Sequence, residues 1–245
     1  THVAGIAAAG NPYARIAIAR IEFGHTLQPD PCPSLELARK DARNTQAYVE
    51  FFRRHGVRVV NMSFGGSVGD VEEQLEQCGI GASAGERRTI AREWFDLGKD
   101  AFVRAMASAP EILFVAAAGN ANADSTFAES VPADIVLPNL ITVGAVDKAG
   151  DEAPFTSYGR TVVVHANGYL VDSVIPGGER LAESGTSMAA PQVTNLAAKM
   201  LAVNPSLTPP QVVAILRDTA ERTADGRRAL IHPQKAIAAA QAART

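Results

Sequence analysis

The segment Gly185-Thr186-Ser187-Met188-Ala189-Ala190-Pro191 says most about the fold and chemistry of this chain. Its serine lies between small residues, immediately before the apolar pattern of a helix, Val193, Leu196, Ala197, Met200 and Leu201. Ser187 is therefore expected at or near a helix N-terminus, where unpaired N–H groups and the helix dipole favour negative charge on a reacting oxygen. Pro191 is expected in the first helical turn, where its missing N–H removes no intrahelical hydrogen bond.

Strand-like and helix-like segments alternate throughout the chain, which predicts an α/β fold with a mainly parallel sheet. We expect strands at 14–21, 57–62, 111–117, 140–146, 161–165 and 170–175. Helices are expected at 1–9, 34–54, 187–203, 208–221 and 233–242, and over 70–109 with a break at 79–85. The chain has no internal repeat, low-complexity segment or strong domain boundary, so a single domain is predicted.

Composition restricts the classes of function. Of 245 residues, 47% are hydrophobic and 20% are charged, as in a globular protein. The net charge of −3 gives no basic footprint for nucleic acid. No apolar run approaches the roughly 18 residues that a membrane span needs.

The two cysteines leave two interpretations open. Cys32 lies between Pro31 and Pro33, and Cys78 lies near the end of a helical stretch. A disulfide between them would suit an extracytoplasmic protein. Two unrelated small residues are an equal alternative, because a single pair has no diagnostic spacing. Neither cysteine has a His or Cys at ligand spacing, which argues against a metal site.

A second motif complements the serine. Acyl transfer needs a base to activate the hydroxyl and hydrogen-bond donors for the oxyanion. The segment Phe114–Asn120 runs from a strand into small residues and then Asn120. Its side-chain amide could donate to an oxyanion at the carboxyl end of the sheet, where α/β proteins bind ligands. A Gly-Asn pair alone is more typical of a turn, so this interpretation depends on Ser187.

Taken together, these motifs resemble those of the subtilisin-like serine proteases, the subtilase or peptidase S8 family. The heptapeptide resembles the family's nucleophile motif, and Phe114–Asn120 resembles its oxyanion-asparagine motif. Phe155–Gly159 is similar to a further family segment of structural character, and Thr1–Gly5 to the tail of the motif around the catalytic histidine. The motifs occur in family order from Thr1 to about residue 220, which implies a subtilisin-like three-layer fold, a mainly parallel central sheet flanked by helices.

The segment Asn61–Gly66 also looks like the family's substrate-binding strand. The resemblance implies that Ser63, Phe64 and Gly65 pair their backbone with an extended peptide, as in strand addition. The same resemblance implies a far wall for the pocket that holds the residue before the cut, formed by Ala117, Ala118 and Gly119.

The chain departs from the family at its start. In the family the catalytic histidine stands two residues before the position matched by His2, which is upstream of Thr1. The catalytic aspartate comes earlier still, in an Asp-Thr-Gly or Asp-Ser-Gly setting that no aspartate here has. His2 would face about 200° away around a helix, so a structural role is expected for it. We therefore expect a single subtilase catalytic domain over 1–245 with its N-terminal part missing, and that N-terminal segment as a partner.

The function implied is that of a secreted serine protease, a hydrolase of polypeptides that forms an acyl-enzyme on Ser187. Extracellular or periplasmic localisation follows from the resemblance alone. Two alternatives stay open: a catalytically inactive protease-like module that binds peptides or partners, and a transpeptidase or macrocyclase using the same residues. An α/β-hydrolase is excluded because Gly185–Ala189 lacks the second glycine of Gly-x-Ser-x-Gly.

The resemblance also raises the question of calcium, which is common in the family. No acidic loop in this sequence assigns a calcium site, and no cofactor or metal ligand is predicted. The stretch 147–152 is expected to be a solvated turn. Ser67–Pro110 is longer than the plain family pattern, and it either shapes the binding cleft or is a tolerated surface insertion.

Overall fold

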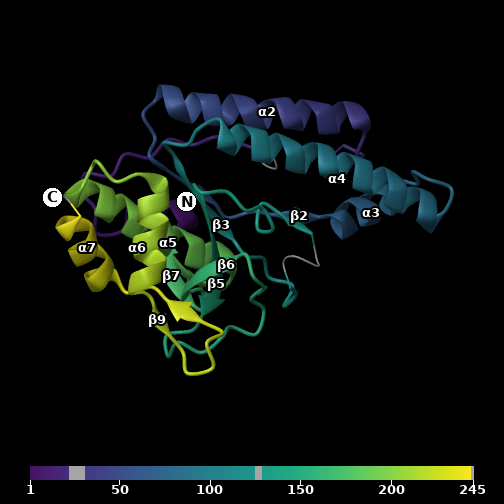
Figure 1. The fold of residues 1–245 in the computed structure, drawn as a ribbon. Coiled ribbons are helices and arrows are strands. Elements are labelled where there is room, and N and C mark those ends of the chain that lie inside the picture. Colours follow the sequence, from purple (N-terminus) through teal and green to yellow (C-terminus); the bar gives the residue numbers. More distant parts are fainter. Residues whose placement is uncertain (22–30, 125–128, 244–245) are drawn as a thin grey trace.

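The computed structural model describes residues 1–21, 31–124 and 129–243. Its centre is a six-stranded sheet in the order β1-β3-β5-β6-β10-β9, parallel except for the last pair (Figure 1). The strands are β1 (Val59–Met62), β3 (Leu113–Ala117), β5 (Leu140–Val146), β6 (Val162–Asn167), β10 (Ala229–Leu230) and β9 (Glu221–Arg222). Two small antiparallel sheets accompany it: β2 (Gly66–Ser67) with β4 (Ser130–Val131), and β7 (Val171–Val174) with β8 (Arg180–Glu183). The predicted α/β fold with a mainly parallel sheet is confirmed.

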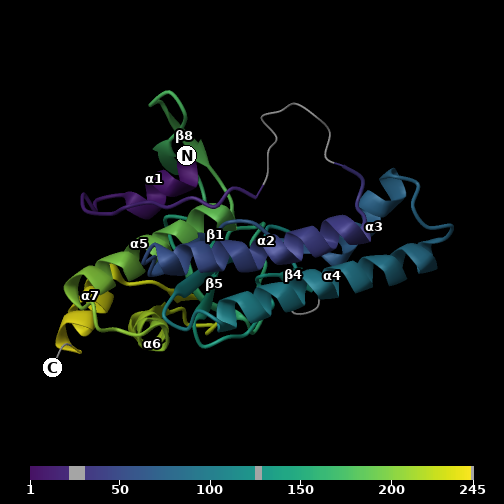
Figure 2. The ribbon, with the colours of Figure 1, turned by 90° about the horizontal axis from the view of Figure 1, so that it is seen from above.

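Helices cover both faces of the sheet. On one face lie α2 (Leu35–Arg54), α3 (Val68–Gln77) and α4 (Ala84–Ala107), and α2 and α4 run side by side in both views (Figures 1 and 2). On the other face lie α5 (Thr186–Val203), α6 (Pro209–Thr219) and α7 (Pro233–Ala242). The short α1 (His2–Ala8) packs against α5 and β7. The arrangement has three layers, as expected.

The buried strands supply two hydrophobic cores. Every residue of β3 and β5 is buried, as expected for parallel strands covered on both faces. Alternate side chains of a strand point to opposite faces, so Val115 joins the core beneath α5, while Phe114 joins the core beneath α4. The residues that follow β3 contact the start of α5, because Gly119 and Asn120 are hydrogen-bonded to Thr186.

Local signals explain most helix boundaries. The Ser34 hydroxyl caps α2 by accepting from the N–H of Leu37 at 3.1 Å, and Gly56 follows the helix with a positive φ of 67°. The predicted break near residue 80 is present between α3 and α4. Cys32 and Cys78 form a disulfide, which fastens the end of α3 to the segment before α2 and decides between the two interpretations left open by the sequence.

One strand prediction was wrong. The segment 14–21 is extended but belongs to no strand, and the side chains of Ile16 and Ile18 are 55% and 75% exposed. Alternating Ile and Ala satisfy the local pattern, but a strand also needs a neighbour for its N–H and C=O groups. Among the described residues no strand runs beside this segment. Within the same residues, no helix has the length and apolar character needed to cross a bilayer.

Candidate active site

Ser187 lies in the first turn of α5, directly after Thr186, where the helix begins. The prediction of a helix N-terminus is thus confirmed, and the N–H of Ser187 has no intrahelical acceptor. The side chain is half-buried, and its hydroxyl donates to the carbonyl oxygen of Ser63 at 3.3 Å. The nucleophile candidate and the end of β1 are therefore in direct contact.

The expected place of Pro191 needs correction. This residue lies inside the helix, in its second turn rather than its first. The N–H that proline lacks would have bonded to the carbonyl of Ser187, four residues earlier. That carbonyl instead accepts a hydrogen bond of 2.8 Å from the hydroxyl of Ser63. The helix tolerates the proline because a neighbouring strand end supplies the missing donor.

Asn120 is held by the residue that precedes Ser187. Its Oδ1 accepts two hydrogen bonds of 2.8 Å from Thr186, one from the N–H and one from the hydroxyl. The Thr186 hydroxyl also accepts from the N–H of Gly119 at 3.1 Å. With its oxygen occupied in this way, the amide of Asn120 keeps Nδ2 as a donor on the side of Gly185. The pattern of residues along the chain did not indicate this role of Thr186, although Thr186 lies within the heptapeptide.

The other predicted substrate-binding residues lie at the ends of β1 and β3. Ser63, Phe64 and Gly65 connect β1 to β2 and belong to no strand among the described residues. The predicted far wall follows the carboxyl end of β3, where the carbonyl of Gly119 accepts from the N–H of Ser157 at 2.9 Å. Its residues are Ala117 and Ala118, both buried, and the half-buried Gly119.

A groove of about 710 Å³ continues from Phe64 between α3 and α4. The ring of Phe64 lies 6.1 Å from the ring of Phe102, and Trp94 also lines the groove. The stretch 67–110, whose helices form two of its walls, therefore borders the candidate substrate strand. This arrangement agrees with the first of the two roles considered for that stretch.

The groove has an acidic border. Asp41, Asp70 and Glu73 line it, together with one cation, Lys99. Lys99 is engaged by the buried carboxylate of Asp134 at 2.7 Å, so the charge facing the groove is negative. Partial removal of water raises the pKa of Asp41, and the nearby Lys40 opposes this shift.

No histidine among residues 1–21, 31–124 and 129–243 is bonded to Ser187. The ring of His2 is buried and Nε2 lies 2.9 Å from the carbonyl oxygen of Leu181, in keeping with a structural role. The other described histidines contact Phe51, Ala229 and Lys235. His25 lies outside the described residues.

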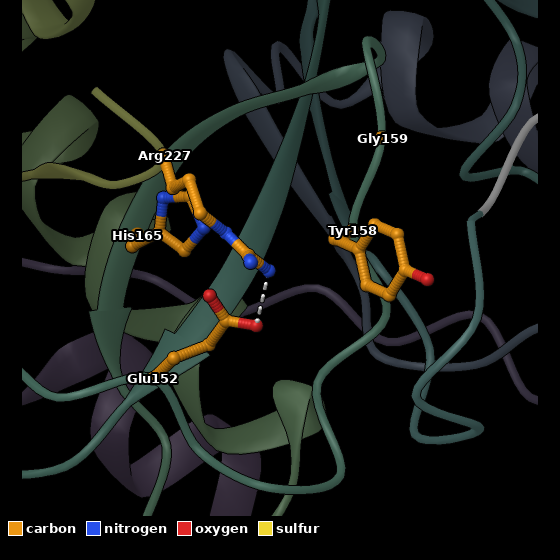
Figure 3. Close-up of a pocket in the computed structure, with 5 residues that line it drawn as sticks. All are labelled: Glu152, Tyr158, Gly159, His165 and Arg227. Atoms are coloured by element: carbon orange, nitrogen blue, oxygen red, sulfur yellow. Dashed lines mark hydrogen bonds and ion pairs between the residues drawn. The ribbon is translucent and has the colours of Figure 1, made fainter. Parts of the chain in front are cut away.

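A smaller cavity of about 320 Å³ lies away from the heptapeptide and is lined by Glu152, Tyr158, Gly159, His165 and Arg227 (Figure 3). Glu152 accepts from Arg227 at 3.2 Å, so the cation and the anion of this cavity are paired with each other. Burial, aided by the charge of Arg228, lowers the pKa of His165 to about 4. His165 is therefore neutral at physiological pH.

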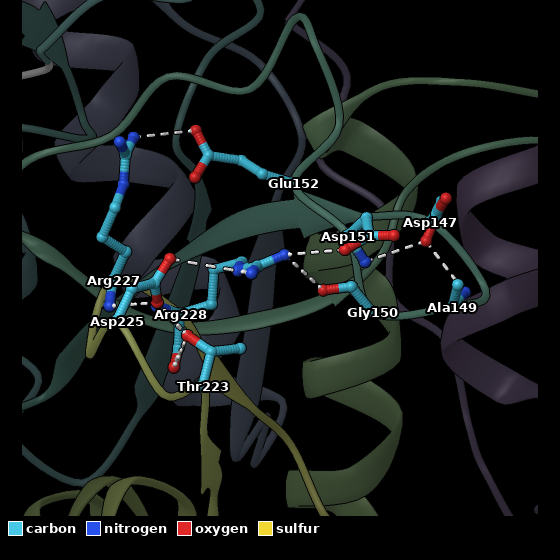
Figure 4. Close-up of polar contacts among 9 residues, drawn as sticks. All are labelled: Asp147, Ala149, Gly150, Asp151, Glu152, Thr223, Asp225, Arg227 and Arg228. Carbon is cyan, nitrogen blue, oxygen red and sulfur yellow. Dashed lines mark hydrogen bonds and ion pairs between the residues drawn. The ribbon is translucent and has the colours of Figure 1, made fainter.

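The stretch 147–152 is a turn, but it is more than solvated. The carboxylate of Asp147 accepts from the N–H groups of Ala149 and Asp151 at 2.8 and 2.9 Å (Figure 4). Arg228 donates to the carbonyl of Gly150 at 2.9 Å and contacts Asp151. Across the described parts of the chain, no group of three or more His, Cys, Asp and Glu side chains is placed to hold a metal ion.

Ser187 at the start of α5, the anchored amide of Asn120 and the segment after β1 thus lie together on a three-layer α/β fold. A model of the subtilase family, peptidase S8, matches residues 1–235. Because the match covers most of the chain, the chain belongs to the subtilase family.

Individual relatives agree with this assignment. Subtilisin from Bacillus pumilus is 42% identical over 114 residues, which are 46% of this chain and 39% of that protein. Alkaline elastase YaB from Bacillus sp. (strain YaB) is 33% identical over 172 residues, which are 68% of this chain and 42% of that protein. A cold-adapted subtilisin-like serine proteinase of known structure has a TM-score of 0.58 and 27% identity over 78% of this chain and 61% of that one. The chain spans less than half the length of either curated relative.

Proposed function

We propose that this chain contributes the larger part of the catalytic domain of a subtilisin-like serine endopeptidase. The observation that carries the proposal is the geometry of Thr186, which binds Oδ1 of Asn120 and stands next to Ser187. Two donor nitrogens lie beside Gly185 at the helix start: a Cβ on that glycine would be 3.4 Å from Nδ2 of Asn120 and 3.7 Å from the N of Ser187. Two such donors are what a tetrahedral intermediate needs for its oxyanion.

In the proposed reaction, Ser187 Oγ attacks the carbonyl carbon of a peptide bond while a base takes the hydroxyl proton. The carbonyl oxygen becomes an oxyanion, which accepts hydrogen bonds from Asn120 Nδ2 and the Ser187 N–H. The intermediate collapses, the amine leaves with the proton, and the acyl group stays on Ser187. Water then attacks the acyl-enzyme. An amine that attacks in its place gives transpeptidation or ring closure through the same residues.

The base and the aspartate that orients it are proposed to come from a segment preceding Thr1, which completes a single domain with residues 1–245. Two observations support this. The described histidines are engaged away from Ser187, and the chain covers less than half of the length of curated family members.

The proposed substrate is an extended polypeptide that adds a strand along Ser63–Gly65. Two observations support the assignment: the segment belongs to no strand among the described residues, and the groove adjoins it. The Cys32–Cys78 disulfide supports an extracellular or periplasmic location, because cytoplasmic thiols are kept reduced.

The test is covalent labelling of the full natural polypeptide with a fluorophosphonate probe. We expect one adduct on Ser187, found by peptide mass spectrometry, and no adduct in a Ser187→Ala variant. A folded parent protein that does not react would overturn the enzymatic proposal. If it still binds extended peptides, the alternative of an inactive peptide-binding module takes its place.

A further inference from the structure

The helix that carries Ser187 is missing one internal hydrogen bond at the nucleophile itself. In a regular α-helix the carbonyl of residue 187 would accept from the N–H of residue 191. Residue 191 is a buried proline, so the Ser187 carbonyl has no intrahelical donor. A carbonyl in a partly buried site needs another partner. The hydroxyl of Ser63, from the end of β1, fills the position at 2.8 Å.

The direction of the Ser63 hydroxyl is itself fixed. Nδ2 of Asn61 donates to Ser63 Oγ at 2.9 Å, so the single hydroxyl proton is directed to the Ser187 carbonyl. Oδ1 of Asn61 accepts from the hydroxyl of Thr194 at 3.0 Å, and Thr194 lies further along the same helix. The end of β1 is thereby connected to α5 at two points, one of which is the nucleophile residue.

The same two residues also meet in the opposite sense. Ser187 Oγ donates to the Ser63 carbonyl at 3.3 Å, while Ser63 Oγ donates to the Ser187 carbonyl. The backbone of Ser63 belongs to the segment proposed to pair with the substrate. Any displacement of the first turn of α5 relative to this segment would therefore change the distance between nucleophile and bound peptide.

We propose that Ser63 and Asn61 are positioning residues, which use the vacancy created by Pro191 to hold Ser187 at a fixed place beside the substrate strand. This inference rests on the proposed function. It assigns the two side chains to the placement of Ser187 and gives them no part in bond making or breaking. Catalysis is sensitive to such placement, because a misplacement of about 1 Å can lower a rate by about 100-fold.

Three variants of the full natural polypeptide separate positioning from simple stability. Ser63→Ala leaves the Ser187 carbonyl without a donor, so both thermal stability and the rate of fluorophosphonate labelling should fall, the rate by about 10- to 100-fold. Pro191→Ala restores an N–H to the helix. In the double variant this N–H satisfies the Ser187 carbonyl, and stability should recover while the labelling rate stays low. A labelling rate that recovers together with stability would overturn the positioning role.

Two controls complete the design. Ser63→Thr keeps the hydroxyl and should restore most of the labelling rate. Ser108→Ala removes a comparable bond of 2.7 Å to the carbonyl of Ala105, at a distant helix end, and should leave the labelling rate unchanged.

The structural part of this proposal can also be tested by hydrogen exchange, which does not depend on a reaction at Ser187. If the parent protein does not label, the proposed function fails, and hydrogen exchange of peptide 183–191 decides the structural claim. Faster exchange in Ser63→Ala than in Ser108→Ala supports the proposal that Ser63 holds the start of α5 against the end of β1. Equal exchange in the two variants overturns it.

Discussion

Thr186 fixes the side-chain amide of Asn120 by donating to the same oxygen twice, once from its backbone and once from its hydroxyl. Because Thr186 is followed by Ser187, the position of the proposed oxyanion donor is coupled to the position of the proposed nucleophile through one peptide bond. The first prediction tests this coupling.

Thr186→Val replaces the hydroxyl by a methyl group of similar shape and removes one of the two bonds to Asn120, as well as the acceptor for the Gly119 N–H. We expect the rate of fluorophosphonate labelling at Ser187 to fall by about 10- to 100-fold, a part of the loss that follows removal of an oxyanion donor. Thr186→Ser retains the hydroxyl and should stay within a few-fold of the parent. Equal rates for both variants would contradict the proposed orientation of Asn120.

Asn139 is a buried amide that closes the C-terminal end of α4. Its Nδ2 donates to the carbonyls of Met106 and Ala109 at 3.0 Å each. Asn139→Ala removes these buried bonds and leaves the two carbonyls with backbone donors only, among them the N–H groups of Ala109 and Ile112. We expect the free energy of unfolding to fall by about 2–4 kcal/mol. Urea denaturation measures the change. The exposed Gln46→Ala on α2 serves as the control and should stay within about 0.5 kcal/mol of the parent.

His165 should make stability depend on pH. Its pKa is about 4 in the folded chain because of burial and the charge of Arg228, below the ordinary value of 6.5. As the pH falls below 6.5, the unfolded chain binds the proton first, so stability is lost progressively until about pH 4. Between pH 7 and pH 5 this loss amounts to about 2 kcal/mol.

The measurement is urea denaturation of the parent and of His165→Gln at both pH values. Glutamine retains an acceptor for the Ala229 N–H but does not titrate. The parent should lose about 2 kcal/mol more than the variant on acidification. Equal losses in the two proteins would show that His165 is protonated equally in the folded and unfolded chains.

The disulfide joins residues separated by 46 positions. Closure of a loop of this size restricts the unfolded chain, so the double variant Cys32→Ser, Cys78→Ser should be about 2–4 kcal/mol less stable than the oxidised parent. A reducing agent should lower the melting temperature of the parent and leave that of the double variant unchanged. The same shift in both proteins would mean that reductant acts elsewhere.

The acidic border of the groove predicts a preference for basic peptides. The groove adjoins Phe64 in the proposed substrate segment, so we expect it to receive a side chain of the bound peptide near the scissile bond. In an inactive Ser187→Ala protein, a peptide with Arg at such a position should bind more tightly than one with Glu. The only tryptophan, Trp94, lines the groove and reports binding by its fluorescence.

The double variant Asp41→Asn, Glu73→Gln should weaken binding of the Arg peptide by about 3- to 10-fold, as expected for partly screened charges. Glu93→Gln, on α4 but outside the groove lining, is the matched control. The preference should also decline on acidification at a pH above the ordinary aspartate range, because burial raises the pKa of Asp41. An unchanged preference in the double variant would remove these carboxylates from substrate selection.

Sequence signals of short range predicted much of the fold. The cap at Ser34, the strand Leu140–Val146 and the start of α5 near Ser187 each depend on a few adjacent residues, and each is present in the structure. The segment 14–21 has the correct alternation for a strand, but pairing depends on a neighbour that a local pattern does not contain.

The contacts that organise the site are of long range and were not predictable from spacing. Ser63 and Ser187 are 124 positions apart, and Asn120 and Thr186 are 66 apart. The motifs identified candidate residues by type, whereas the hydrogen bonds between them depend on how β1, β3 and α5 meet. The pairing of Cys32 with Cys78 was open for the same reason.

The sheet separates two cores, and the two halves of the proposed site are built on opposite ones. The helix of Ser187 packs with Val193 and Leu196 into one core, whereas the groove helices pack with Phe95 and Met106 into the other. Substitutions on opposite sides that share no partner have additive effects on stability. The exposed groove-facing positions within 67–82 could therefore be exchanged to alter recognition, with Val68, Leu75 and Cys78 retained, while the surroundings of Ser187 stay unchanged.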